Sequence, residues 1–155
     1  MVKPKRLGHL VIRVRDLARS QQFYTDVLGL QVTAELGDRM AFLSAAGDSS
    51  HELALMAIGE GAPGPEANRV GLYHFAWEME SFDDLRKIYR ELGEKNVPVA
   101  GKGDHGISMG VYFFDPDGNE IEVFYELPRD QWPERDIFTG GFPMSLEEEP
   151  AAEAV

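Results

Sequence analysis

Short runs of alternating apolar and polar residues each lead into a longer stretch with helical periodicity, and this order occurs twice along the chain. In the first half, residues 7–14 alternate as a strand does, and Asp16 is placed to cap the helix that follows. Gly29 is expected to end this helix. Three further strand-like runs, separated by turn residues, are expected at 31–36, 39–44 and 51–58.

The second half repeats this order of elements after a connector rich in Gly and Pro at 59–68. Residues 70–80 form the expected strand, and Ser81 with Asp84 forms a capping box for the helix behind it, which Gly93 is expected to end. The remaining strands are expected at 97–100, 109–114 and 120–127, the last two joined by a turn at 115–119.

The pattern therefore predicts an α+β fold made of two βαβββ modules, at 5–58 and 69–127. Together they are expected to form one domain over residues 1–127. Residues 128–155 are expected to be a C-terminal extension with a disordered acidic tail that contains Glu147, Glu148, Glu149 and Glu153. The aromatic residues of 128–144 have no periodicity, and this stretch is expected to pack over the concave side of the sheets, against a partner subunit or as a surface wrap.

Two histidines occupy equivalent places in the two modules. His9 and His74 lie 65 residues apart, each in the first strand of its module. A doubled unit can bring such residues to one point near a pseudo-twofold axis, and two convergent imidazoles are typical of a metal site. A single histidine in a strand is more often packed or exposed than ligating, so the repeat carries this hypothesis.

A carboxylate in the last expected strand completes the candidate metal site. Alternation places Glu122 with Glu120 and Glu126 on one face of this strand, away from the apolar face that packs on the helices. His9, His74 and Glu122 would then bind one ion and leave other coordination positions open. Two imidazoles and one carboxylate suit Fe(II) with O2, and they also accept Mn(II).

Composition removes several other functions from consideration. The net charge of -12 argues against binding to nucleic acid, which requires clustered Lys and Arg. The chain has no cysteine, which excludes disulfides and thiolate metal sites and is compatible with a cytoplasmic location. No apolar run approaches the roughly 20 residues needed to span a bilayer, and the basic N-terminus has no apolar stretch behind it to form a signal peptide.

Three segments give the chain a resemblance to a known superfamily. They are 7–17 (LGHLVIRVRDL), Phe23 and Tyr24 followed by 27–30 (VLGL), and 115–122 (DPDGNEIE). With the doubled βαβββ order, they resemble the vicinal oxygen chelate superfamily of glyoxalases, bleomycin-resistance proteins and dioxygenases over about residues 5–127. The resemblance implies mixed sheets that form a concave, open-barrel metal site with helices outside, and homodimers are common in this superfamily.

Two further histidines and a tyrosine resemble the type I extradiol ring-cleaving dioxygenases within this superfamily. The segment 51–55 (HELAL) is similar to the stretch whose histidine acts as the acid–base catalyst, which implies this role for His51. The segment 104–108 (DHGIS) with Tyr112 is similar to pocket residues that hydrogen-bond to substrate or oxygen, which implies this role for His105 and Tyr112. The implied activity is cleavage of a small catecholic substrate by O2 at Fe(II).

One ambiguity leaves two other functions open. His51 and Glu52 are neighbours on a strand, so only one of them should face the metal. If Glu52 faces it, two histidines and two glutamates resemble the ligand set of glyoxalase I, a metal-dependent isomerase. Aligning Glu122 with Glu52 favours this alternative, whereas the His105 and Tyr112 segment favours His51. A non-catalytic small-molecule binder is the third possibility, although it has no need of a metal triad.

Overall fold

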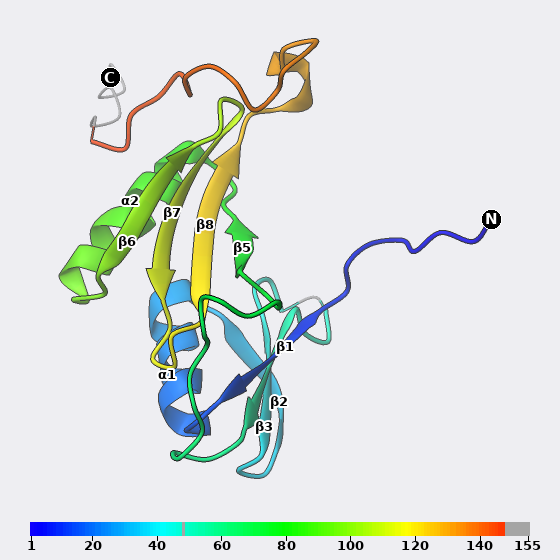
Figure 1. Cartoon of the computed structure of the whole chain (residues 1–155), viewed down its shortest axis with the longest axis vertical. Helices are drawn as coiled ribbons and strands as arrows, with labels where there is room; N and C mark the ends of the chain where they lie inside the picture. The colour runs from blue at the N-terminus through cyan, green and yellow to red at the C-terminus, as the bar shows by residue number, and fades with distance from the viewer. Residues whose placement is uncertain (48, 148–155) are drawn as a thin grey trace. The chain divides into compact units, whose positions relative to one another are not determined.

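The computed structural model describes residues 1–47 and 49–147. These residues divide into two compact units, one made of residues 1–67 with 115–118, the other of residues 68–114 with those from 119 onward. Each unit contains one helix and one four-stranded mixed sheet. The predicted α+β class and the doubled βαβββ order are therefore confirmed (Figure 1).

The first unit is built on a sheet with the strand order β1-β4-β3-β2, in which β1 pairs in parallel with β4 and the other pairs are antiparallel. The helix α1 packs on β4, β3 and β2 through a face that buries Tyr24 and Val27. Its ends follow the prediction, since the Asp16 side chain accepts from the Arg19 N–H at 2.8 Å and Gly29 adopts φ 67°. The elements are β1 (Leu10–Val14), α1 (Leu17–Leu28), β2 (Gln31–Leu36), β3 (Met40–Ser44) and β4 (Leu53–Ala57).

The turn at 115–118 belongs to the first unit and provides its buried polar centre. The Asp117 carboxylate accepts from the backbone and guanidinium of Arg15, from Arg19 and from the hydroxyl of Ser20. Next to it, the hydroxyl of the buried Tyr24 donates to Asp115 at 2.9 Å. Burial and the two neighbouring carboxylates raise the pKa of Tyr24 well above its usual value.

The second unit repeats this topology with the strand order β5-β8-β7-β6, in which only β5 and β8 pair in parallel. Its helix α2 lies against the sheet and buries Leu85, Ile88 and Leu92 (Figure 1). The Ser81 hydroxyl caps the helix by accepting from the Asp84 N–H, as predicted. The elements are β5 (His74–Glu78), α2 (Phe82–Glu94), β6 (Val99–Asp104), β7 (Ser108–Phe114), β8 (Glu120–Glu126) and the 3-10 turn η1 (Arg129–Gln131).

Several element boundaries differ from the sequence-based prediction. The first strand of each unit starts later, because pairing begins only where β4 and β8 run alongside. Helix α2 passes Gly93 and ends at Glu94, and Asn96 instead takes the left-handed conformation with φ 55°. Strand β6 continues to Asp104 rather than ending at residue 100, because it pairs with β7 along this length.

The described part of the C-terminal segment packs on the second unit. Phe142 is buried against Phe82 of α2 and Tyr125 of β8, with ring centroids 5.1 and 6.4 Å away. The Arg86 guanidinium donates to the Ser145 carbonyl at 2.8 Å. Among the expected arrangements, these contacts fit a surface wrap over the helical side of this unit. Glu147, the first glutamate of the predicted disordered tail, accepts from Lys102 and from the Ser145 hydroxyl. The rest of the tail, from Glu148 onward, lies outside the described residues.

None of the helices in the described ranges is both long enough and apolar enough to cross a membrane.

Candidate metal and catalytic site

In the first unit the structure brings His9 and His51 together. His9 immediately precedes β1 and His51 precedes the parallel strand β4, so that their rings lie 4.5 Å apart between centroids. The edge of Phe42 in β3 packs against the His51 ring at 5.1 Å, and the Ser50 hydroxyl lies 3.1 Å from His51 Nδ1. His51 is therefore half-buried on the face of this sheet that also carries His9.

Glu52 is held in a different set of contacts. Its carboxylate accepts from the hydroxyl of Ser49 and from the backbone N–H of Ala45, at 2.9 Å for the latter. These bonds, led by the one from Ser49, lower the pKa of the Glu52 carboxyl below its ordinary value. Glu52 thus organises the turn before β4, and of the two neighbouring residues it is His51 that contacts His9.

The strand register corrects the alignment of Glu122 with Glu52. In the parallel pairs, Val11 lies opposite Ala54 in the first unit, and Ala76 lies opposite Glu122 in the second. Since Val11 and Ala76 are two residues beyond His9 and His74, the residue equivalent to Glu122 is Ala54. Ala54 is fully buried and provides no metal ligand. The first unit therefore has no carboxylate at the position that a set of two histidines and two glutamates requires.

In the second unit four predicted site residues form one connected array. His74 Nε2 lies 3.3 Å from a carboxylate oxygen of Glu122. The Tyr112 hydroxyl donates to the other oxygen of Glu122 at 2.9 Å, and Tyr112 Oη lies 3.0 Å from His105 Nε2. Because the Tyr112 proton is directed to Glu122, the bond with His105 is satisfied when His105 Nε2–H donates to the Tyr112 oxygen.

Strand pairing explains why these side chains meet. Tyr112 in β7 lies directly opposite Glu122 in β8, and His74 starts the strand on the other side of β8. Glu122 is 8% exposed, so its carboxylate is buried between an imidazole and a phenol. Burial, the bond to Glu122 and its charge raise the pKa of Tyr112, which keeps this hydroxyl protonated at neutral pH.

Two glycines that the sequence analysis did not single out make room for this array. Gly103 and Gly110 lie opposite each other in the β6–β7 pair. A Cβ on Gly110 would overlap with the Glu122 carboxylate, and one on Gly103 would lie 2.9 Å from His105 Nε2 and 3.1 Å from the Tyr112 oxygen. Glycine within a strand signals such close approach. This signal was available for Gly110 in the strand expected at 109–114, but not for Gly103, because residues 101–108 were not expected to belong to a strand.

The donor set in the second unit suits a divalent metal ion. His74 and Glu122 offer an imidazole nitrogen and a buried carboxylate side by side, which Fe(II) and Mn(II) both accept. The other nitrogen of His74, Nδ1, is buried without a hydrogen-bond partner in the described part of the chain. Residues 1–47 and 49–147 contain no group of three His, Asp, Glu or Cys side chains arranged to hold a metal. The joint site of His9, His74 and Glu122 therefore stays a prediction.

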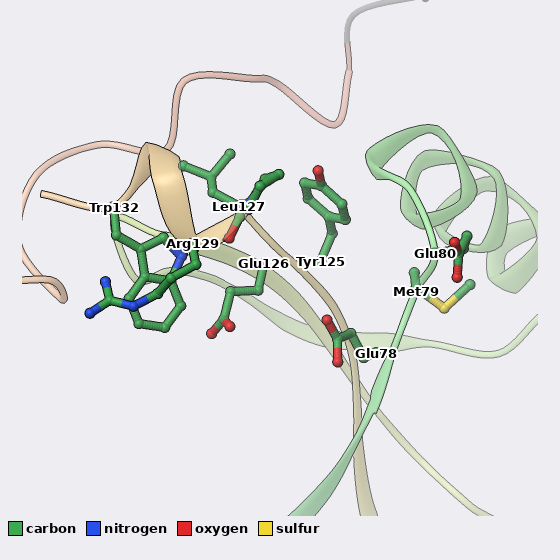
Figure 2. Close-up of a pocket in the computed structure, with 9 residues that line it drawn as sticks. Glu78, Met79, Glu80, Tyr125, Glu126, Leu127, Arg129 and Trp132 are labelled. Atoms are coloured by element: carbon green, nitrogen blue, oxygen red, sulfur yellow. Dashed lines mark hydrogen bonds between the residues drawn. The ribbon is translucent and has the colours of Figure 1, made fainter.

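A hollow of about 650 Å³ lies further along β5 and β8, at their C-terminal ends (Figure 2). The carboxylates of Glu78 and Glu126 point into it, and Trp132 closes one side with the Arg129 guanidinium over its ring. Burial, followed by the charge of Glu78, raises the pKa of Glu126. None of the predicted site residues lines this hollow.

Comparisons with known proteins agree with this topology and these motifs. The family model of the Glyoxalase/Bleomycin resistance protein/Dioxygenase superfamily matches residues 6–123, and the chain belongs to this family. The chain is 37% identical over 127 residues to the "Catechol-2,3-dioxygenase" of Bacillus subtilis, which aligns 81% of this chain with 43% of that protein. It is 34% identical over 124 residues to the "Biphenyl-2,3-diol 1,2-dioxygenase 3" of Rhodococcus globerulus, with 79% of this chain and 64% of that protein covered.

The chain thus spans less than two thirds of the length of either curated relative. Among solved structures, the lactoylglutathione lyase from Agrobacterium tumefaciens superposes with a TM-score of 0.63 at 23% identity, over 79% of this chain and 95% of that one. This likeness shows the shared fold.

Proposed function

We propose that this chain is a metal-dependent extradiol dioxygenase that cleaves a small catecholic substrate with O2. The observation that carries the proposal is the side-chain arrangement before β4, where His51 contacts His9 and Glu52 is held by Ser49 and Ala45. An isomerase of the glyoxalase I type would need a carboxylate in the first unit beside His9. The Glu52 carboxylate is hydrogen-bonded to Ala45, and the position equivalent to Glu122 is occupied by Ala54, which has no carboxylate. The two dioxygenase relatives support the same choice.

The metal ligands in this proposal are His9, His74 and Glu122, with Fe(II) as the ion and Mn(II) as an alternative. Two neutral imidazoles and one carboxylate match the preference of both ions. The ion supplies the redox and Lewis-acid chemistry that lets O2 react with an aromatic diol. A homodimer and a cytoplasmic location stay predictions of the resemblance and of the cysteine-free composition.

The protein's own residues then position the substrate and move protons. His51 takes a proton from one catechol hydroxyl and returns it as the ring opens, a role that suits an imidazole because its ring nitrogens can both accept and donate a proton. His105 and Tyr112 orient the substrate by hydrogen bonds. Tyr112 is held by its bond to Glu122, and His105 by its bond to Tyr112. Phe42 packs against His51 and limits the orientations of its ring.

The test is oxygen uptake by the Fe(II)-loaded protein with a panel of catechols, with absorbance followed for a yellow ring-opened product. We expect uptake that matches product formation one to one. His51→Ala should bind metal normally and lose turnover by about 10²–10⁴-fold, the usual contribution of a general acid–base residue. Its neighbour provides a matched control, since Glu52→Gln should keep both metal binding and turnover.

Two results would contradict the proposal. One is metal-loaded protein that consumes no oxygen with any catechol, in which case isomerisation of a glutathione hemithioacetal is the next assay. The other is a Glu52→Gln variant that loses its metal while His51→Ala retains turnover, because this result would exchange the roles assigned to the two residues.

A further inference from the structure

His74 has a second acidic neighbour, on the side of its ring away from Glu122. Glu120 lies directly opposite His74 in the parallel β5–β8 pair, whereas Glu122 lies opposite Ala76. A Glu120 oxygen is 4.0 Å from His74 Nδ1, and the Glu120 side chain is 16% exposed. The two nitrogens of His74 therefore face two different carboxylates of one strand.

The buried Nδ1 atom needs a partner that Glu120 is placed to provide. Nδ1 has no hydrogen bond within the described residues, and a distance of 4.0 Å is too long for one. If Nε2 gives its lone pair to a metal, the neutral ring must carry its proton on Nδ1. A buried N–H without an acceptor is unfavourable, and a small rotation of the Glu120 side chain would bring an acceptor within reach.

We propose that Glu120 is a positioning residue that accepts the His74 Nδ1–H and so directs Nε2 toward Glu122 and the metal. Metal-ligating histidines generally give their second N–H to a carboxylate or carbonyl, which fixes the tautomer and the orientation of the ring. The ladder position and the burial of Glu120 distinguish it from an ordinary solvent-facing residue of β8. The inference rests on the proposed metal site and adds to it the group that orients its second histidine.

The test uses Zn(II) as a diamagnetic probe, with affinity measured by isothermal titration calorimetry and the His74 N–H followed by proton NMR. Glu120→Leu removes the acceptor, and Glu120→Gln keeps a carbonyl oxygen at the same place. Glu126→Leu is the matched control, because Glu126 lies on the same face of β8 and does not contact His74. Glu120→Ala removes the acceptor with less bulk and serves in case the leucine variant does not fold. His74→Ala assigns the NMR signal.

In the Zn(II)-loaded protein we expect a protected imidazole N–H signal from His74. Glu120→Leu and Glu120→Ala should lose this signal and weaken Zn(II) binding by about 10–100-fold. Glu120→Gln should restore most of the affinity, and Glu126→Leu should match the unmodified protein. Neither readout involves catechol, so an inactive protein that still shows this pattern would count against the proposed reaction and support the role of Glu120.

The inference is overturned if the leucine and alanine variants bind Zn(II) as tightly as the unmodified protein and keep the protected signal. It is equally overturned if Glu120→Gln weakens binding as much as Glu120→Leu, because the effect would then come from the charge of Glu120 and not from an acceptor at this position.

Discussion

At the residue scale, the Glu122 carboxylate has room because its neighbour, Gly110, has no side chain. Gly110 lies beside the Glu122 carboxylate so closely that even a methyl group would overlap with it. Because Gly110 lies within β7 and pairs with Gly103, two neighbouring strands share this small-residue position. A side chain at position 110 would therefore require the Glu122 carboxylate to move.

The first prediction concerns this position. Gly110→Ala should displace the Glu122 carboxylate and weaken metal binding by roughly tenfold or more, the scale found when groups that orient metal ligands are changed. Gly101→Ala is the control, because a Cβ at this strand glycine has nothing within 4 Å and should leave the affinity unchanged. Calorimetric titration with Mn(II) measures both. Equal affinities for the two variants would show that Glu122 does not hold the metal.

Glu52 leads to a second prediction, on pH. Its pKa is lowered in the folded state, so its contacts stabilise the protein above the unfolded value near 4.5 and this contribution is lost as the pH falls through the lower folded pKa. Thermal melting should therefore show that Glu52→Gln lowers the melting temperature at pH 7 and that its difference from the unmodified protein shrinks toward pH 3. A difference that does not change with pH would mean that the Glu52 charge contributes nothing to stability.

At the element scale, the turn at 115–118 fixes helix α1 within the first unit. One buried carboxylate, Asp117, engages two arginines and one serine near the start of α1, and Asp115 bonds to Tyr24 one turn further along. The side chain of Asp117 is 5% exposed, whereas those of Arg15 and Arg19 are 26% and 41% exposed. Removal of Asp117 would thus leave two cations that water can partly reach, together with an unpaired backbone N–H.

The third prediction follows from this arrangement. Asp117→Ala should lower the free energy of unfolding by about 2–4 kcal/mol, because several charge-assisted hydrogen bonds are lost together. Asp26→Ala, an exposed residue of the same helix, should change it by less than about 0.5 kcal/mol. Urea denaturation followed by circular dichroism compares the two variants. Similar midpoints would mean that the turn adds little to the stability of α1.

The features of the fold that could be predicted from sequence are those fixed by residues close together in the chain. The starts of both helices were predicted correctly, because Asp16 and Ser81 cap N–H groups only three residues away. The length of β6 was not, because it depends on pairing with β7 rather than on its own Gly-rich sequence. Likewise, alternation alone could not predict whether His51 or Glu52 lies beside His9. Hydrogen bonds from Ser49 and Ala45 hold Glu52 elsewhere, and these bonds depend on the conformation of the preceding turn.

At the scale of the whole chain, two modules with one topology carry different chemistry. The first unit offers a pair of imidazoles, His9 and His51, and has alanine where the second has Glu122. The second unit adds the carboxylate, with His105 and Tyr112 connected to it. Equivalent strand positions in the two modules therefore hold different side chains.

The C-terminal segment is a further difference between the modules, because its described residues pack on the second unit. Phe142 is 8% exposed between Phe82 and Tyr125, and Phe138 is 69% exposed four residues earlier. The main-chain N–H of Phe142 also donates to Asp104 at the end of β6. Phe142 is therefore the residue through which this segment is expected to be attached.

The last prediction compares these two phenylalanines. Phe142→Ala should cost about 2–4 kcal/mol through lost burial and the cavity left against α2, and it should release the segment before the unit unfolds. Trypsin should then cleave at the exposed Arg135 faster than in the unmodified protein, whereas Phe138→Ala should leave the cleavage rate unchanged. Mass spectrometry of a digestion time course identifies the site. Equal rates at Arg135 in both variants would mean that the segment is attached through its polar contacts, the Arg86 bond to Ser145 and the Asp104 bonds, and not through the Phe142 ring.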